Sequence, residues 1–362
     1  MKAAVFHGPK LPLSIEDVEI DQPQDREVRV RTVASGVCHS DLHFVDGFYP
    51  YAAPAVLGHE AAGVVEEVGK QVTYLKPGDH VIACLSVFCG YCEQCMAGHP
   101  NRCSNKAATQ RDPKDKPRIS QKGKLINQFL DLSSYCERML VHENALVKIR
   151  EDIPLDHAAL VGCGVTTGVG AVLNTAKVEP GSTVAVFGCG GVGLSIIQGA
   201  RIGGARQIIA IDQYETKREM ATRAGATHFV DSKEDDPVKR VRALTGGAGV
   251  DHAFEAVGLA SLVRQAIESL AIRGTATIVG VLPPDAMIEF PWMAIRPECK
   301  VQTSRMGSNR FRYDIPLYLD FYRQGRLDLD GMVTKRGRLD DINEAFRAMK
   351  AGEVARTVLT FD

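Results

Sequence analysis

The sequence predicts two domains: an all-β domain built from both ends of the chain and a parallel α/β domain inserted between them. Residues 1–164 are rich in Gly, Pro and short apolar runs such as EVRVRTVASGV, which are typical of strands between turns. Residues 165–301 alternate apolar runs such as STVAVFG and QIIAID with helix-like stretches, which indicates a doubly wound parallel sheet. Residues 302–362 end in EVARTVLTF, a strand-like run that we expect to return to the first domain.

The composition is that of a globular protein long enough for two cores. The chain has 362 residues, 45% hydrophobic and 24% charged, with a formal net charge of -1. This balance provides no polybasic surface for nucleic acid or anionic lipid. The N-terminus lacks the apolar core of a signal peptide, and no run approaches the ~20 apolar residues of a membrane span. We therefore expect a cytoplasmic enzyme whose ten cysteines are metal ligands, catalytic groups or buried thiols rather than disulfides.

A glycine motif follows the first strand-like run of the α/β region. Gly188, Gly190 and Gly193 form G-x-G-x-x-G between a strand and a helix, the context of a dinucleotide-binding turn. The three glycines permit a tight turn, close approach of a pyrophosphate and close packing of the helix. Asp212 ends the next strand, where a carboxylate accepts from ribose hydroxyls and repels a 2′-phosphate, so NAD is favoured over NADP. The alternative is a similar sheet that binds another nucleotide.

Four cysteines are concentrated in a short lobe at residues 88–104. Cys89, Cys92, Cys95 and Cys103 are separated by two, two and seven residues. This spacing suits a zinc ion closed by four thiolates. Iron–sulfur sites have similar spacings, so the cluster alone is ambiguous. Burial of four thiols in so polar a loop is the weakest interpretation.

Three further donors are spread along the chain. Cys38, His59 and Cys163 provide two thiolates and one imidazole, which leave a fourth position open, as in a catalytic zinc site. Such a metal lowers the pKa of bound water or alcohol towards neutrality. Each residue alone is more often an ordinary core or surface group.

In motif content and order, the chain resembles the zinc-dependent alcohol dehydrogenases of the medium-chain dehydrogenase/reductase family. The resemblance rests on GHEAAGVVEEVG, KPGDHV, the four-cysteine lobe, the glycine motif and the terminal RTVLTF, and it covers essentially the whole chain. It implies a GroES-like β domain with an inserted Rossmann domain and an active site in the cleft. It further implies two zinc ions per subunit, one catalytic and one structural, with NAD as cofactor, an alcohol or aldehyde as substrate and a homodimer.

The resemblance also implies roles for individual residues. Cys38, His59 and Cys163 match the catalytic zinc ligands, and the four-cysteine lobe matches the structural site. Glu60 matches an acid that can visit the metal, and Asp41 matches a carboxylate that orients the ligand histidine. Ser40 and His43 match the pair that carries the substrate proton to solvent. The positions that match cofactor contacts are His39, Thr167, Gly188, Gly190, Gly191, Val192, Gly193, Asp212, Lys217, Val279, Val281 and Arg356.

Departures from the family pattern inform the substrate. Ser40 replaces a threonine and leaves more space for a bulky alcohol, and His39 replaces an arginine and should hold the cofactor more weakly. The residues expected to line an apolar substrate pocket are Tyr49, Leu85, Phe129 and Leu130, with Val281 completing it. We therefore expect interconversion of aldehydes with medium or bulky primary alcohols, aromatic and terpenoid alcohols included.

Two alternatives stay open. The first is a thiol-adduct dehydrogenase of the formaldehyde type; Tyr49, where the glutathione-dependent branch carries an acidic residue, argues against a glutathione adduct. The second is a non-catalytic protein that binds NAD and zinc, although Ser40 and His43 would then serve no purpose. The polar segment 107–123 is expected to be a surface excursion, and no role is assigned to Cys84, Cys136, Cys189 or Cys299.

Overall fold

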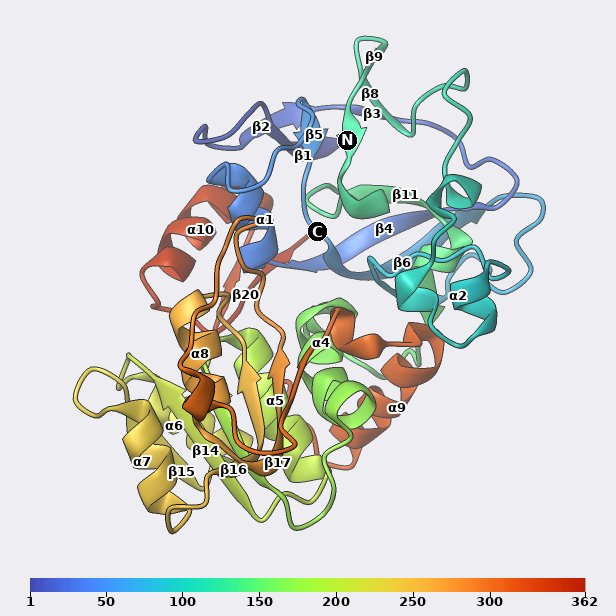
Figure 1. The fold of residues 1–362 in the computed structure, drawn as a ribbon. Coiled ribbons are helices and arrows are strands. Elements are labelled where there is room, and N and C mark those ends of the chain that lie inside the picture. The colour runs from blue at the N-terminus through green and yellow to red at the C-terminus, as the bar shows by residue number, and fades with distance from the viewer. Residues whose placement is uncertain (362) are drawn as a thin grey trace. The chain divides into compact units, whose positions relative to one another are not determined.

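The computed structural model of the chain describes residues 1–361 and divides into two compact units. Unit 1 comprises Met1–Cys163, Arg310–Asp320 and the residues from Val333 onward, and unit 2 comprises Gly164–Asn309 and Phe321–Met332. Unit 1 is a β domain and unit 2 contains a parallel sheet, so the predicted fold class is confirmed. Figure 1 shows the strands and helices of each unit.

Unit 1 is built on one large sheet and two small ones. The large sheet has the order β12 (Leu146–Lys148), β7 (His80–Ala83), β6 (Glu60–Val68), β4 (Glu27–Gly36), β20 (Thr357–Thr360) and β19 (Lys335–Gly337), and β11 (Arg138–His142) also pairs with β4. The small sheets are β10 (Asn127–Gln128), β5 (Ala55–Val56), β1 (Lys2–Phe6) and β2 (Ser14–Asp17), and β3 (Glu19–Ile20), β8 (Ile119–Gln121) and β9 (Lys124–Leu125). Its helices are α1 (His39–Val45), α2 (Glu93–Met96), α3 (Leu155–Ala159), α9 (Phe311–Arg323, which extends into unit 2) and α10 (Ile342–Lys350).

The two ends of the chain meet in this large sheet. Strand β20 lies antiparallel to β4, with Val358 opposite Gly36 and Thr360 opposite Ala34. Val358 and Leu359 of the terminal run are fully buried there, which explains why this run is apolar. The expected return of the C-terminus to the first domain is therefore confirmed.

A buried ion-pair network ties the polar segment 107–123 to unit 1. Glu27, only 3% exposed at the start of β4, accepts from Nε of Arg111 at 2.9 Å and from Nε of Arg118 at 2.7 Å. Arg118 also donates to the Thr109 carbonyl at 2.8 Å, and Arg111 to Asp21 at 2.6 Å. Because both guanidinium groups have several acceptors, this segment is anchored at its two arginines rather than being a free loop.

Unit 2 carries the doubly wound parallel sheet that the sequence predicts. Its order is β15 (His228–Asp231), β14 (Gln207–Asp212), β13 (Thr183–Phe187), β16 (Val250–Glu255), β17 (Leu270–Ile278) and β18 (Lys300–Thr303). Its helices are α4 (Gly164–Gly170), α5 (Gly191–Ile202), α6 (Lys217–Ala224), α7 (Pro237–Leu244) and α8 (Ala260–Glu268), and α5 packs on α6 while α7 packs on α8. In chain order the strands are arranged 3-2-1-4-5-6, so the order reverses between β13 and β16, where such folds bind ligands.

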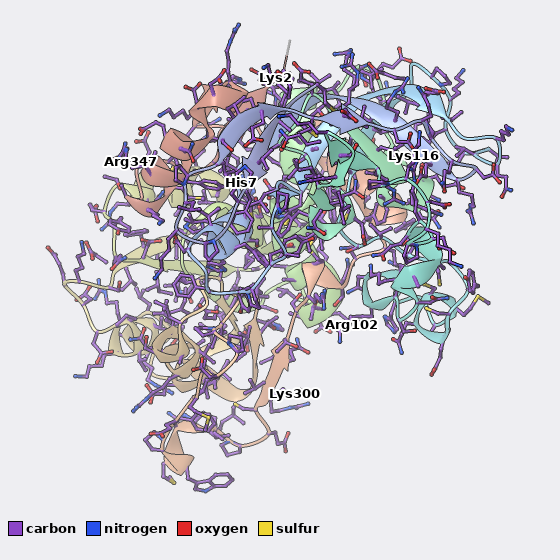
Figure 2. All side chains as sticks on the ribbon, turned by 90° about the horizontal axis from the view of Figure 1, so that it is seen from above. Lys2, His7, Arg102, Lys116, Lys300 and Arg347 are labelled. Carbon is purple, nitrogen blue, oxygen red and sulfur yellow. The ribbon has the colours of Figure 1, made fainter. Side chains whose placement is uncertain are left out.

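The surface charges of unit 1 are dispersed. Figure 2 shows Lys2, Lys116 and Arg347 projecting outward from the ribbon. Lys2 pairs with Asp17 at 2.8 Å and Arg347 with Glu344 at 2.8 Å, all through exposed side chains. Such pairs add little stability.

Among the described residues, no single helix is long and apolar enough to cross a membrane. One bent pair of helices, Leu155–Gly162 with Gly164–Ala176, reaches that length and apolar character only when the two are taken together.

We predict that Glu27→Gln destabilises the protein by roughly 3 to 5 kcal/mol, because two buried guanidinium groups lose the carboxylate that neutralises them. Urea unfolding at neutral pH measures the change. The matched control is Glu67→Gln, which removes a half-exposed partner of Arg29 in the same sheet and should have little effect. The prediction would be contradicted if Glu27→Gln lowered the free energy of unfolding by no more than the control does.

Candidate active site

The first candidate site is a buried group of four donors in unit 1: Cys38, His59, Glu60 and Cys163. Their ligand atoms all lie within 4.8 Å of one another, and none of the four residues is more than 5% exposed. The donors come from three separate segments, so only the fold brings them together. The sequence predicted three of them as zinc ligands and Glu60 as an acid beside the metal, and the structure places all four in one cluster.

Each of these donors stands at the boundary of a secondary-structure element. Cys38 is the N-cap of α1, His59 directly precedes β6, and Cys163 follows the 3-10 turn Leu160–Gly162. Gly58 turns the chain into His59 with a φ of +89°, and a Cβ there would lie 2.6 Å from Oγ of Ser134. Only glycine fits this position, and the turn it permits aims His59 at the two cysteines.

The two thiols compete for one negative charge. A hydrogen bond from the Cys163 thiol lowers the pKa of Cys38 well below its ordinary value, and the same contact raises the pKa of Cys163. A divalent cation between them would let both ionise, because a coordinating thiol gives up its proton. Nε2 of His59 is buried and has no hydrogen-bond partner among residues 1–361, so it is available to the same ion. Two sulfurs and one imidazole therefore fit a catalytic zinc.

Asp41 orients His59 from the side opposite the thiols. Nδ1 of His59 donates to Oδ1 of Asp41 at 2.9 Å, which directs Nε2 towards the two thiols. Burial lowers the pKa of His59, but the Asp41 carboxylate and the Cys38 thiolate outweigh burial and raise this pKa well above its usual range. The other oxygen of Asp41 accepts from the hydroxyl of Tyr135 at 2.8 Å. Sequence reasoning missed Tyr135, because nothing local distinguishes it from an ordinary core aromatic.

Glu60 forms a buried ion pair with Arg356. Nη2 of Arg356 donates to Oε1 of Glu60 at 3.0 Å, and Nη1 donates to the Val37 carbonyl at 3.3 Å. Burial raises the pKa of Glu60 to about 7, although the charge of Arg356 opposes this rise. The sequence assigned Arg356 to a pyrophosphate. The structure places its guanidinium beside Glu60, and its contact with a dinucleotide stays a prediction.

Helix α1 carries the residues assigned to proton transfer. Ser40 and His43 are three residues apart, so they share one face of the helix, whereas Asp41 is buried on another and His39 is exposed at the first turn. The His43 ring lies edge-on to Phe48, with 5.7 Å between ring centroids. Burial lowers the pKa of His43, so its imidazole is neutral near pH 7 and can accept a proton.

An aromatic group adjoins the metal-site histidine. Phe129 is fully buried, its ring centroid is 6.1 Å from that of His59, and it packs edge-on against Phe44 at 4.9 Å. Tyr49 contacts the same Phe44 ring at 5.8 Å. Of the other residues assigned to a substrate pocket, Leu130 packs against this cluster, whereas Leu85 packs against a different core cluster.

The second metal centre is the four-cysteine lobe around α2. The Sγ–Sγ distances are 3.5 Å for Cys92–Cys95, 3.9 Å for Cys92–Cys103 and 4.0 Å for Cys89–Cys95. Four sulfurs around one tetrahedral zinc, at Zn–S ≈ 2.3 Å, lie about 3.8 Å apart. Backbone N–H groups of Cys89 and Cys92 donate to neighbouring sulfurs at 3.3 Å, which stabilises thiolates. All ten cysteines are free, so the lobe fits a closed structural zinc and not disulfides.

In unit 2, the glycine motif forms the turn between β13 and α5. Gly188 has a φ of +98°, and a Cβ on Gly193 would lie 1.8 Å from the Gly188 carbonyl oxygen, so the turn and its packing require both glycines. Gly190 differs, because no protein atom lies within 4 Å of a Cβ placed there. Its small size leaves open space at the N-terminus of α5, where a pyrophosphate fits. Gly191 and Val192 begin that helix.

Asp212 joins this turn to the end of β14. Its carboxylate accepts from the backbone N–H of Cys189 at 2.7 Å and of Tyr214 at 3.1 Å. Lys217, the first residue of α6, is 5% exposed, and burial lowers its pKa while Asp212 opposes the change. The structure thus places Asp212 at the carboxyl edge of the sheet beside the glycine turn, as an adenosine-ribose contact requires.

On the other side of β13, strand β16 ends in a buried carboxylate. Glu255 is fully buried and accepts from the N–H groups of Val257 at 2.9 Å and Gly258 at 2.6 Å, and its carbonyl accepts from Val279 N–H at 2.8 Å. This carboxylate was not singled out in the sequence, because its role depends on folding. Among the other predicted cofactor residues of unit 2, Val279 and Thr167 are buried, and Val281 is 49% exposed.

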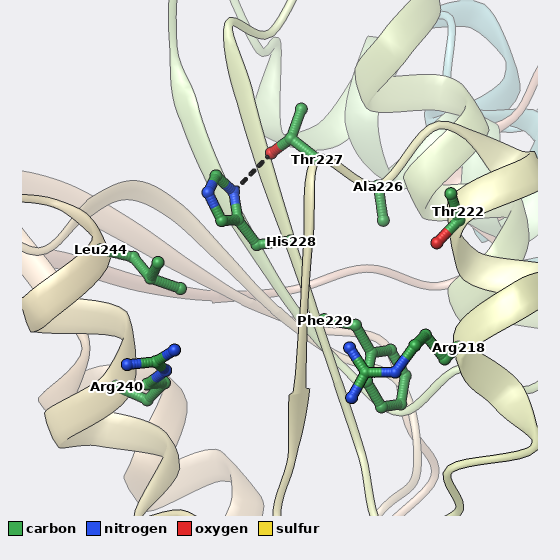
Figure 3. A pocket seen from close by; sticks show the side chains of 8 residues that line it. All are labelled: Arg218, Thr222, Ala226, Thr227, His228, Phe229, Arg240 and Leu244. Carbon is green, nitrogen blue, oxygen red and sulfur yellow. Dashed lines mark hydrogen bonds between the residues drawn. The ribbon is translucent and has the colours of Figure 1, made fainter.

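A separate hollow of about 300 Å³ lies on unit 2 between α6, β15 and α7. Figure 3 shows Arg218 lying over the Phe229 ring, with His228 and Arg240 on the opposite walls. Both arginines already face carboxylates, Arg218 that of Glu215 and Arg240 that of Asp235 at 3.7 Å. The hollow therefore presents little uncompensated charge to a ligand.

Comparison with known proteins identifies the family. Residues 24–151 match the alcohol dehydrogenase GroES-like domain, and residues 191–323 match the zinc-binding dehydrogenase domain. The chain is 40% identical to an alcohol dehydrogenase class-3 of Zea mays (99% of this chain, 96% of the relative). It is also 40% identical to an S-(hydroxymethyl)glutathione dehydrogenase of Escherichia coli O1:K1 (99% of each). The crystal structure of benzyl alcohol dehydrogenase from Acinetobacter calcoaceticus is similar, with a TM-score of 0.93 and 33% identity over 100% of this chain and 99% of that one.

Two donor groups fit for a metal ion and a glycine turn of the dinucleotide-binding type therefore occur in a chain whose whole length matches an alcohol dehydrogenase. Zinc and NAD(P) are the cofactors that these features specify, and the substrates are small alcohols and aldehydes. The chain belongs to the zinc-dependent alcohol dehydrogenases of the medium-chain dehydrogenase/reductase family.

Proposed function

We propose that this chain interconverts aldehydes with medium or bulky primary alcohols, aromatic alcohols included, using NAD. The observation that carries this proposal is the aromatic group of Phe44, Tyr49 and Phe129 beside His59, which suits an apolar alcohol tail. The likeness to a benzyl alcohol dehydrogenase supports it. A thiol-adduct activity is the second candidate, because one relative at 40% identity is an S-(hydroxymethyl)glutathione dehydrogenase.

In this proposal the side chains of unit 1 prepare the alcohol for oxidation. Cys38, His59 and Cys163 would hold the catalytic zinc, and the four-cysteine lobe would hold a structural one. Zinc, when bound, polarises the alcohol hydroxyl and lowers its pKa, and NAD supplies the hydride acceptor. Ser40 accepts the hydroxyl proton and His43, neutral because burial lowers its pKa, relays that proton to solvent. Asp41 accepts from Nδ1 of His59 and so directs Nε2 towards the metal.

We also propose a homodimer formed at the free edge of the unit 2 sheet. Strand β18 pairs with β17 and has no other partner strand among residues 1–361, so one row of its backbone groups is open. The exposed apolar side chains of this region include Met287, Trp292, Met293 and Val301, with 78%, 80%, 83% and 53% of their surface exposed. An unpaired edge bordered by such a surface suits a second copy of the sheet.

The test of the substrate proposal is the initial rate of NAD reduction with ethanol, hexanol, benzyl alcohol, geraniol and the adduct of formaldehyde with glutathione. We expect kcat/KM to rise with apolar size, by up to about fourfold per methylene group, since each buried methylene contributes ~0.8 kcal/mol. Activity confined to the adduct would instead establish the thiol-adduct function.

We predict that Ser40→Ala lowers kcat by roughly 100-fold or more, because the substrate proton loses its first acceptor. Ser40→Thr keeps the hydroxyl and should retain activity. The dissociation constant of NAD, measured by protein fluorescence, should be the same in both variants. Unchanged turnover in Ser40→Ala would rule out the proposed proton path.

We predict that Asp212→Gly lowers the preference for NAD over NADP, measured as the ratio of the two kcat/KM values, by at least about tenfold. The reason is that contact between a carboxylate and a 2′-phosphate costs more than the ~1.4 kcal/mol that equals a factor of ten. Asp231→Gly, at the end of the adjacent strand, is the matched control and should preserve the ratio. Equal use of both cofactors by the unmodified protein would contradict the assignment of Asp212.

A further inference from the structure

We infer that Tyr135 is a positioning residue of the catalytic metal site, acting through the Asp41 carboxylate on His59. Its hydroxyl donates to Oδ2 of Asp41 at 2.8 Å, while Oδ1 accepts from Nδ1 of His59 at 2.9 Å and from Gly58 N–H at 3.1 Å. Tyr135, Asp41 and His59 are all fully buried. The inference rests on the proposed function in one respect, since it takes His59 as a zinc ligand.

The hydroxyl controls how the carboxylate is turned. The two other donors both engage Oδ1, so without Tyr135 the second oxygen of Asp41 would be buried with no donor. The carboxylate would then be free to rotate about its Cβ–Cγ bond. Oδ1 would no longer be aligned with the Nδ1–H of His59. A zinc-bound histidine depends on that partner for its tautomer and ring orientation. The Tyr135 hydroxyl therefore keeps Nε2 of His59 aimed at the position between Cys38 and Cys163.

Backbone hydrogen bonds and ring packing fix the position of Tyr135 beside Asp41. Its N–H donates to the Leu57 carbonyl at 3.0 Å, its carbonyl accepts from Ala4 N–H at 2.9 Å, and its ring lies edge-on to Phe346. A Cβ on Gly58 would lie 2.7 Å from Cδ1 of Tyr135, so the ring is pressed against the turn that precedes His59. Burial raises the pKa of Tyr135 well above its usual value, so the hydroxyl remains a donor. Phenylalanine would fill the same space, and only the hydroxyl is specific to this contact.

The test compares Tyr135→Phe with a matched control, Tyr51→Phe. Tyr51 is a partly buried tyrosine of the same unit whose hydroxyl donates to the Gln128 carbonyl at 2.9 Å and makes no contact with Asp41. Zinc per chain is measured by atomic emission on the purified proteins. Its release to excess 4-(2-pyridylazo)resorcinol is then followed by absorbance, and urea unfolding reports overall stability.

We expect two zinc ions per wild-type chain, released in two phases. Tyr135→Phe should accelerate one phase by about 3- to 10-fold, below the roughly 10- to 100-fold typical of losing the direct partner of a ligand histidine. The other phase should be unchanged, and Tyr51→Phe should match the wild type in both. In the background of Asp41→Asn, adding Tyr135→Phe should have no further effect, because the contact acts through that carboxylate.

Three results would overturn the inference. Equal zinc release from Tyr135→Phe and the wild type would show that the hydroxyl does not serve the metal site. Acceleration of both phases, or an unfolded variant, would show that it serves the fold in general. A wild-type chain with a single zinc, held by the four-cysteine lobe, would refute the proposed catalytic site itself and the inference with it.

Discussion

The dense packing of ionisable donors in an apolar interior is the constraint on which the rest of unit 1 depends. Two thiols, an imidazole and a carboxylate within 4.8 Å of one another would repel or neutralise one another if left alone. Two of them are met by a specific group instead: Arg356 faces Glu60, and Asp41 faces His59. A divalent cation bound there would complete this arrangement, because it would allow both thiols to be charged together.

The scaffold around the cluster is organised to hold these donors still. Gly58 lies against Tyr135 and gives the turn that precedes His59, and β20 brings Arg356 from the far end of the chain to β4. Buried charge recurs at Glu27, where two arginines secure the polar segment that crosses the domain surface. In each case a buried charge is tolerated because its partner is also buried and well oriented.

Carboxylates with well-oriented partners also occur in unit 2, where the partners are backbone N–H groups. The two strands that flank β13 end in carboxylates that accept from backbone N–H groups of nearby loops. Asp212 accepts from Cys189 and Tyr214, and Glu255 accepts from Val257 and Gly258. These contacts shape the loops on either side of β13, where the strand order reverses. The conformation of the glycine turn is thereby stabilised by a side chain at the edge of the sheet.

The sequence by itself determined the features whose chemistry is local. The glycine turn depends on residues within one short segment, so its spacing and context were enough to predict it. The alternation of apolar runs predicted the fold class, whereas the spacing of the four-cysteine lobe left zinc and iron–sulfur both open. Residue type suggested the donor set of Cys38, His59 and Cys163, and the resemblance to a family assigned these residues as ligands. The contacts of Tyr135 with Asp41 and of Arg356 with Glu60 were decided by tertiary structure, because they join residues 94 and 296 positions apart. Periodicity and spacing carry no information on which distant side chains meet; packing of the folded sheets decides that.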